Sequence, residues 1–392
     1  MGPGLKSRGM DTLTHGLAGA LLARALPSTG DETLDRTLAR REAWVGFAAA
    51  MFPDADVFVS PFSAEFYITQ HRAFTHSFVT LPAWVIVLTL VASIRLSPAL
   101  GPPGAAGRRT AMRRLGFVVA LALASHILLD WITSWGTMFL SPISWARFAL
   151  DWTFILDAAL SGLLVLGLVG VRAVSRRSFP RSRVAARAGL LATAAYVGLC
   201  GVLHGEAVRL GRTLAPLSKD RAAIPQPGSP DRWLLLSDDG SAVTATFVDL
   251  GKRGREIARP PEEDELARTG FRGGALNLLR HLDGVYRSRD DLAPRVIDKA
   301  NGPFARATLE SSIAGVFGRF ARFPAAREER QGDSVEVLLR DVRFGYLSKD
   351  VDPFTYIVRY SLQGRILFSG FPSSRWNREA APRAVGAAHA AN

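Results

Sequence analysis

Apolar residues gather in the first half of the chain, in runs long enough to cross a membrane. Four runs approach the ~20 residues that span a bilayer core, and they lie at about 78–97, 115–134, 151–172 and 187–208. Two weaker runs precede them at about 12–26 and 43–59, and FPDAD interrupts the second. The pattern predicts an α-helical polytopic membrane domain with about four to six transmembrane helices.

The second half of the chain has the composition and alternation of β-strands. Two apolar runs flank an Asp-Gly turn signal in RWLLLSDDGSAVTATFVDL. The segments SVEVLLRDVRF and TYIVRYSLQGRILFSGF show similar alternating or paired β-rich runs. A helix is expected at about 262–282. The predicted domains are a disordered start over 1–10, the membrane domain over 11–208, a linker over 209–230, a soluble β-rich α+β domain over 231–375 and a disordered tail over 376–392.

Arginine supplies most of the net charge of +13. Arginines crowd alternate loops between the apolar runs: Arg36, Arg40 and Arg41, then Arg108, Arg109, Arg113 and Arg114, then Arg172, Arg176, Arg177, Arg181, Arg183 and Arg187. Short positive loops mark the cytoplasmic side, so with six crossings both termini and the β-rich domain are expected outside the cytoplasm. This use of arginine makes a nucleic acid partner unexpected. The single cysteine, Cys200, excludes an intramolecular disulfide and a Cys-rich metal site.

The ionisable side chains of the apolar half are few and clustered. Two pairs are spaced four residues apart, which places both members on one helix face: Asp11 with His15, and His126 with Asp130. Other members end or open apolar runs, or lie in one loop: Asp54, Asp56, His71, His76, Asp151 and Asp157. In the six-crossing arrangement these segments meet near the outer membrane face, so we expect one site there. His204, His281 and His389 stay outside this set.

Histidines and carboxylates together are ligands for Zn²⁺, and also for Mn²⁺ or Fe²⁺. We predict one or two divalent ions, with ligands drawn from His15, Asp54, Asp56, His71, His76, His126 and Asp130. Supporting positions or additional ligands are Asp11, Ser77, Asp151 and Asp157. A bound metal would make a nucleophile of water, with Asp54 or Asp56 as ligand or base. The planar fork of Arg72 suits a phosphate or another anion.

Each piece also has a simpler interpretation. A single His–Asp pair in a membrane helix is often a structural hydrogen bond, FPDAD can be a helix stop, and His71 with His76 can be interfacial polar residues. A serine nucleophile, at Ser77 or Ser125, is a further alternative, although serine is also common at helix starts and in helix packing. The clustering of all the pieces favours a metal site.

Four ordered motifs resemble the bacterial membrane-bound metal-dependent hydrolases of the YdjM/YbcI-like family: DTLTHGLAGALLA, FPDADV, HRAFTHSF and SHILLDWITSWGTMFLSP. The match covers roughly residues 11 to 172 and implies a bacterial inner-membrane enzyme. A more distant similarity connects the order of His15, Asp54 or Asp56, His71 or His76, and His126 with Asp130 to zinc-dependent phospholipase C and the S1/P1 nucleases. It implies a helical core of that type and phosphoester hydrolysis. The later ligands of the phospholipase pattern are missing, which favours one or two metals over three.

The resulting hypothesis is a membrane-bound metal-dependent hydrolase. Membrane lipid surrounds it, and a phosphoester or lipid-linked substrate is expected because the site lies at head-group depth on the outer face. One alternative is an ion- or proton-coupled transporter that uses the same His/Asp cluster; it predicts polar groups spread through the membrane depth. Another is a membrane scaffold with a structural metal. The sequence makes no prediction of oligomeric state.

Overall fold

A computed structural model of the chain describes residues 8–59, 64–96, 106–254, 284–344 and 355–371. Contacts divide the chain into two units. The first unit comprises residues 1–57, 70–206 and 225–231, and the second comprises residues 58–69, 207–224 and 232–392. Most of the helices belong to the first unit, and the β-strands belong to the second, except for Pro225 at the end of the first strand. The predicted helix at about 262–282, the tail at 376–392, and His281 and His389 lie outside the described residues.

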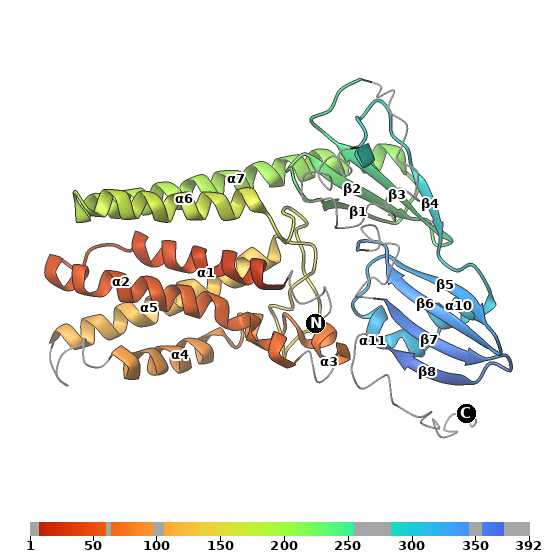
Figure 1. Cartoon of the computed structure of the whole chain (residues 1–392), viewed down its shortest axis with the longest axis horizontal. Coiled ribbons are helices and arrows are strands. Elements are labelled where there is room, and N and C mark those ends of the chain that lie inside the picture. The colour runs from red at the N-terminus through yellow and green to blue at the C-terminus, as the bar shows by residue number, and fades with distance from the viewer. Residues whose placement is uncertain (1–7, 60–63, 97–105, 255–283, 345–354, 372–392) are drawn as a thin grey trace. The chain divides into compact units, whose positions relative to one another are not determined.

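Helices that run side by side form the first unit, here called the helical unit (Figure 1). Its main helices are α1 (Arg8–Ala25), α2 (Glu32–Met51), α4 (Leu81–Leu96), α5 (Ala106–Trp131), α6 (Ala158–Ser175) and α7 (Phe179–Leu214), and α7 continues past Glu206 into the second unit. Shorter elements follow α2: η2 (Phe52–Val59), α3 (Ala64–Gln70) and η3 (Phe74–His76). Helices α1, α2 and α5 pack against one another, while α4 packs on α5 and α6 packs on α1.

Apolar length separates these helices into two groups. Within the part of the chain that the structure describes, three helical segments are long and apolar enough to cross a membrane: Arg108–Trp131, Ala158–Ser175 and Phe179–Leu214. A bent pair, Glu65–His76 with Leu81–Ile94, can act as a fourth. Helices α1 and α2 do not meet the criterion. The prediction of a helical membrane domain is thus confirmed for three to four candidate spans.

Backbone contact through glycine brings two helix pairs together. On α1 and α2, a Cβ added to Gly19 would lie 2.2 Å from the carbonyl oxygen of Gly46. On α6 and α7, a Cβ added to Gly189 would lie 2.9 Å from the Cα of Gly167. Such small residues let membrane helices approach to backbone distance, where close packing supplies the attraction that lipid cannot. The site segments on α1 and α2 are therefore held by a close crossing.

An aspartate caps the start of both α2 and α6, and the start of α6 differs from the sequence prediction. Asp31 caps α2, and its carboxylate accepts from the backbone N–H groups of Thr33 and Leu34. Asp157 caps α6 in the same way. The helix predicted to begin at about 151 in fact begins at Ala158, and residues 151–157 are not helical. The carboxylate of Asp157 satisfies N–H groups that the first helical turn leaves without partners.

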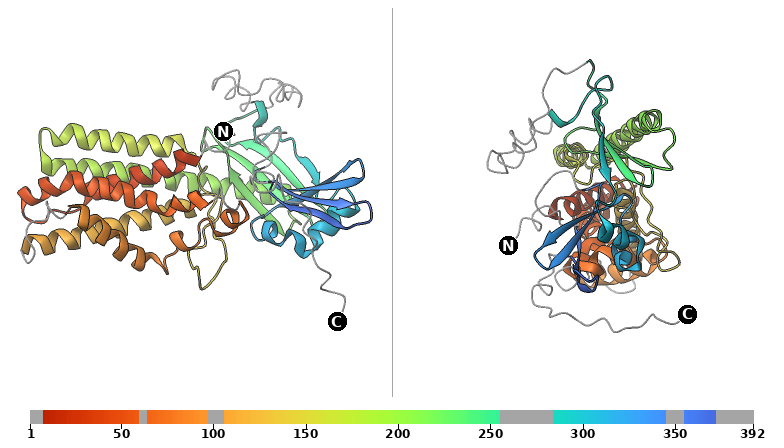
Figure 2. Two further views of the ribbon diagram at one scale, coloured as in Figure 1. Left: turned by 60° about the horizontal axis from the view of Figure 1, so that its bottom comes forward. Right: turned by 90° about the vertical axis from the view of Figure 1, so that its right-hand side faces the viewer.

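The second unit contains two four-stranded sheets (Figure 2). The first has the order β1-β2-β3-β4, formed by Asp220–Pro225, Arg232–Asp238, Ala242–Asp249 and Arg295–Asp298. The second has the order β5-β6-β7-β8, formed by Pro324–Gln331, Ser334–Asp341, Tyr356–Ser361 and Ile366–Gly370. Along the chain, three short helices follow β4 and precede β5: α10 (Pro303–Glu310), η6 (Ser312–Ala314) and α11 (Gly315–Gly318). The strands predicted from alternation are confirmed.

The predicted Asp-Gly hairpin illustrates why the strands form. Strands β2 and β3 pair antiparallel from Arg232 opposite Asp249 to Asp238 opposite Val243, and Gly240 has a φ of 99° in the turn. Alternate side chains of this hairpin enter an apolar core that includes Leu234, Leu236, Val243, Ala245 and Phe247. The predicted linker at 209–230 is corrected, because α7 continues to Leu214 and β1 occupies Asp220–Pro225.

Candidate metal centre

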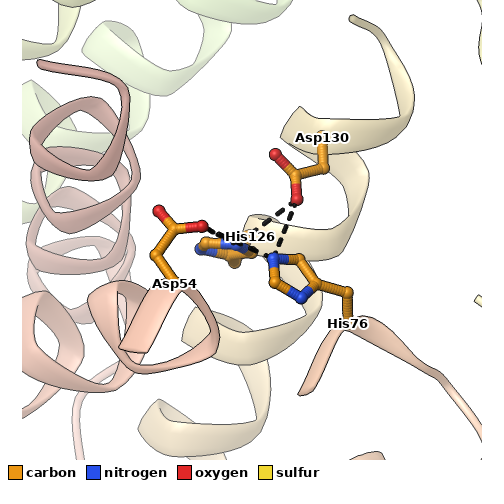
Figure 3. Close-up of side chains that lie close together, drawn as sticks. All are labelled: Asp54, His76, His126 and Asp130. Carbon is orange, nitrogen blue, oxygen red and sulfur yellow. Dashed lines mark ion pairs between the residues drawn. The ribbon is translucent and has the colours of Figure 1, made fainter. Parts of the chain in front are cut away.

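Three separate segments deliver the ionisable side chains to one place in the helical unit (Figure 3). Asp54 comes from the 3₁₀ turns that follow α2, where proline in FPDAD prevents the α-helical hydrogen-bond pattern from continuing. His76 ends the short η3 turn. His126 and Asp130 come from α5, four residues apart on one face. The predicted convergence of these segments is therefore observed for these four residues.

The four side chains direct one atom each into a small common space. Nε2 of His76 lies 3.5 Å from Oδ1 of Asp54 and 3.1 Å from Oδ2 of Asp130. Nε2 of His126 lies 3.5 Å from the same Asp54 oxygen and 3.4 Å from the same Asp130 oxygen. The four atoms lie within 4.8 Å of one another. They form a compact set of two nitrogens and two oxygens.

A backbone carbonyl determines which ring nitrogen of His126 faces the carboxylates. Its Nδ1 lies 2.6 Å from the carbonyl oxygen of Ala50. A carbonyl oxygen only accepts, so Nδ1 carries a proton and Nε2 of the neutral ring is a lone pair. That lone pair faces the carboxylates of Asp54 and Asp130, which are also acceptors. Nε2 of His126, like Nε2 of His76, is buried without a hydrogen-bond partner among the described residues.

A divalent cation resolves this meeting of acceptors. Zinc binds imidazole nitrogen and carboxylate oxygen at ~2.0–2.1 Å, so ligand atoms on one ion lie about 3–4 Å apart. The four nitrogen–oxygen distances here are 3.1 to 3.5 Å, and the four atoms lie within 4.8 Å of one another. The donor set also suits Mn²⁺ or Fe²⁺. Asp54, His76, His126 and Asp130 are therefore the residues that fit a metal ion.

Arg72 fixes the carboxylate of Asp130. Its Nη2 lies 2.8 Å from Oδ1 of Asp130, and its Nη1 donates to the Thr133 hydroxyl at 2.8 Å and to the Asp130 carbonyl at 3.2 Å. Oδ1 thus faces a guanidinium, and Oδ2 faces the two histidines. The backbone of Arg72 has a φ of 66°, a conformation that is uncommon for residues other than glycine. Its side chain is buried, and the anion-binding role suggested by the sequence stays a prediction.

His15 lies against the four-donor group without belonging to it. Its Nε2 is 3.4 Å from Oδ1 of Asp130, the oxygen that Arg72 also contacts. Its ring stacks on that of His126 with centroids 3.9 Å apart. His15 thus packs behind two of the four donors and limits their movement. The sequence placed it among the ligands, and the structure places it beside them.

Asp56 and His71 form a neighbouring acid–imidazole pair. Nδ1 of His71 lies 2.9 and 3.0 Å from the two oxygens of Asp56. Oδ2 of Asp56 is 4.0 Å from Nδ1 of His76, and the ring of His71 lies edge-on to that of Trp135. This pair therefore adjoins the four donors, and its atoms lie outside the compact group.

The remaining predicted positions have other partners. Ser77 is buried, and its hydroxyl donates to the carbonyl of Ser141 at 2.6 Å. Asp157 caps α6 and accepts from the Tyr196 hydroxyl at 2.8 Å. Asp151 is buried in the loop before α6, with a φ of 56°. Asp11 lies on α1, one turn before His15 as predicted, but its side chain lies outside the described residues.

Some contacts in the site carry little signal in the sequence. The hydroxyl of Thr12 donates to Oδ2 of Asp54 at 2.7 Å, and Thr133 accepts from Arg72. The Ala50 carbonyl that fixes the His126 ring belongs to the last turn of α2. Thr12 adjoins the predicted Asp11–His15 pair, which is the nearest sequence signal. A backbone carbonyl leaves no signal of residue type.

Comparison with known families decides the relationship of the chain. The model of the YdjM inner membrane protein family matches residues 10–207. The chain belongs to the YdjM inner membrane protein family. The matched region contains all four donors, and together with the apolar helices it indicates an inner-membrane location. No curated protein and no solved structure matches the chain.

Proposed function

We propose that this YdjM-family protein is a metal-dependent hydrolase of the inner membrane. The observation that carries the proposal is the meeting of two imidazole nitrogens and two carboxylate oxygens at 3.1 to 3.5 Å, with three of the four side chains fully buried. Burial of unpaired acceptors costs free energy. A bound cation offsets that cost, so the arrangement supports a resident divalent metal, with zinc as the first candidate.

A metal held by these four residues, with a coordination position left for water, would supply Lewis acidity and make that water more acidic. The protein's own groups give the site a direction. The side chains of His76, His126 and Asp130 are 0% exposed, whereas Asp54 is 13% and Asp56 is 18% exposed. A substrate therefore approaches from the side of Asp54 and Asp56. Asp56 and His71 offer hydrogen bonds on this side that would orient an attacking water.

The proposed substrate is a phosphoester, and a lipid-linked one suits an enzyme embedded in a membrane. We place the site near the extracytoplasmic face, because arginines cluster at the opposite ends of the helices: in the first half of α2, at the start of α5, and from the end of α6 into the start of α7. The membrane domain has six crossings in this orientation if α1 and α2 also cross the membrane. A helical core like that of phospholipase C and the P1 nuclease is part of the same proposal.

The direct test is hydrolysis by the purified full-length chain in detergent. The protein would be supplied with Zn²⁺ or Mn²⁺ and assayed on bis(p-nitrophenyl) phosphate and on a phospholipid analogue. We expect metal-dependent release of product, abolished in His126→Ala and Asp130→Ala. His204→Ala is the matched control, because His204 lies on α7 outside the four donors, and this variant should retain activity.

Two outcomes would contradict the proposal. Hydrolysis that survives in both His126→Ala and Asp130→Ala would place the chemistry elsewhere. Stoichiometric metal without hydrolysis, accompanied by ion flux in liposomes, would favour the transporter alternative.

A further inference from the structure

Three arginines from different helices surround one aromatic ring at the end of the helical unit where α1 meets α2 and α6 meets α7 (Figure 1). The ring is that of Phe179, the first residue of α7. The guanidinium carbons of Arg24, Arg36 and Arg183 lie 5.5, 4.9 and 5.0 Å from its centroid. Each distance is within the range of a cation–π contact. The ring thus gathers three positive charges at one position.

Two of the three charges have carboxylate partners. Arg183 contacts the buried carboxylate of Asp35 at 2.6 Å. Arg36 contacts Glu32 at 2.6 Å, one helical turn earlier on α2. These pairs orient the two guanidinium groups beside the ring.

Arg24 differs from its two neighbours. Within the described residues its guanidinium forms no ion pair, and its hydrogen bond is to the hydroxyl of Ser182 at 3.4 Å. The residue is half-buried. The buried carboxylate of Glu42 attracts it from a distance, but Glu42 is in direct contact with Arg114, which also contacts Asp35. Across this group four arginines (Arg24, Arg36, Arg114 and Arg183) face three carboxylates (Glu32, Asp35 and Glu42). The position therefore has one positive charge in excess, which a ligand can match.

We propose that Arg24, Arg36 and Arg183 bind the phosphodiester head group of an anionic phospholipid. A phosphodiester carries a single negative charge, which matches the one positive charge in excess, and its oxygens suit the planar fork of arginine. The side chain of Arg36 is 55% exposed and leaves access to the ring. A lipid is the fitting source in an inner-membrane protein, since basic pockets between membrane helices recognise anionic head groups.

This site is separate from the metal centre. Arg24 follows His15 by nine residues on α1, which corresponds to about 14 Å along the helix. From Asp35 to Met51, where α2 ends before Asp54, the distance is about 24 Å by the same rise. The bound lipid would therefore stabilise the far end of the helices and would not be the substrate. The inference does not depend on the hydrolase proposal.

The test uses the full-length chain in nanodiscs of phosphatidylcholine, with or without phosphatidylglycerol. We expect phosphatidylglycerol to raise the unfolding midpoint and to remain bound in native mass spectrometry. Arg24→Gln should weaken this binding about tenfold, since it removes a charge-assisted contact. Arg109→Gln, an exposed arginine on α5 with the same change in charge, should keep the bound lipid.

A second variant guards against misfolding of Arg24→Gln. Arg36 is largely exposed, so Arg36→Gln should fold and bind phosphatidylglycerol more weakly than Arg109→Gln does. Equal loss of lipid in the Arg36, Arg24 and Arg109 variants would show generic surface attraction and overturn the proposal. An equal midpoint shift from inorganic phosphate in detergent would show that the ligand is free phosphate, which would overturn the lipid assignment.

Discussion

Removing one imidazole at a time can show which histidines bind the metal and which only surround it. Structural zinc sites with four protein ligands bind with an apparent free energy of about 10–16 kcal/mol, so one ligand contributes roughly 2.5–4 kcal/mol. His126 supplies one of four donors, with contacts of 3.4 and 3.5 Å to the two carboxylates. His126→Ala should therefore weaken zinc binding by about two to three powers of ten.

His71 provides the matched comparison within the same pocket. It is also a histidine with a carboxylate partner, but that partner is Asp56, and neither belongs to the four donors. His71→Ala should weaken zinc binding by less than about tenfold, below the range for groups that hold a ligand directly. His204→Ala should leave zinc affinity unchanged.

The assay is competition between purified protein and a chromophoric chelator, with zinc content checked by elemental analysis. The assignment of the four donors fails if His71→Ala loses as much affinity as His126→Ala, because the donors would then be a different set. It also fails if the wild-type chain binds no zinc, manganese or iron after reconstitution.

Three further substitutions test contacts that hold the helical unit together. Arg72→Gln should destabilise the protein by about 3–5 kcal/mol in thermal unfolding, since it leaves the buried charge of Asp130 without its partner, and adding Asp130→Asn should recover part of the loss. Gly19→Ala should destabilise by about 1–3 kcal/mol, because its Cβ would lie 2.2 Å from a carbonyl oxygen of α2; Gly162→Ala, with no atom within 4 Å of the added Cβ, should not. Burial opposes ionisation of Asp35, but hydrogen bonds from the preceding loop and a nearby arginine lower its pKa overall. Its stabilising contribution is therefore present above the ordinary aspartate pKa of about 3.9 and is lost as pH falls through the lower folded value, so unfolding measured against pH should show Asp35→Asn less stable near neutrality and similar to wild type in acid.

Residue spacing predicted the α5 half of the site well. His126 and Asp130 are four residues apart within a long apolar run, so any helix there places them on one face. The same rule could not choose between Asp54 and Asp56, or between His71 and His76. Those residues lie in 3₁₀ turns and a bend, where the direction of a side chain depends on the local backbone.

Arg72 shows a different limit of sequence reasoning. An arginine between two histidines suggests an anion site, because residue type alone does not reveal burial. In the structure a positive φ at Arg72 accompanies a side chain that faces inward, toward Asp130. A glycine would have indicated a positive φ at this position, but an arginine in the sequence does not.

Helix ends were predicted less well than helix centres. The run from 151 is apolar enough to suggest a helix, and the true start is marked by Asp157, whose side chain can cap a first turn. Conversely, α7 begins at Phe179, before its apolar run, because arginine is a good helix former. Composition locates the apolar part of a helix, and capping residues locate its start.

The order of the four donors along the chain has a consequence for biogenesis. They occur between Asp54 and Asp130, so the nascent chain contains the whole set before α6, α7 and the two sheets have been synthesised. At 5–20 residues per second, the ribosome covers this interval in about 4–15 s. Metal acquired at that stage of membrane insertion would join the segment after α2, the His76 turn and α5 before the rest of the protein exists.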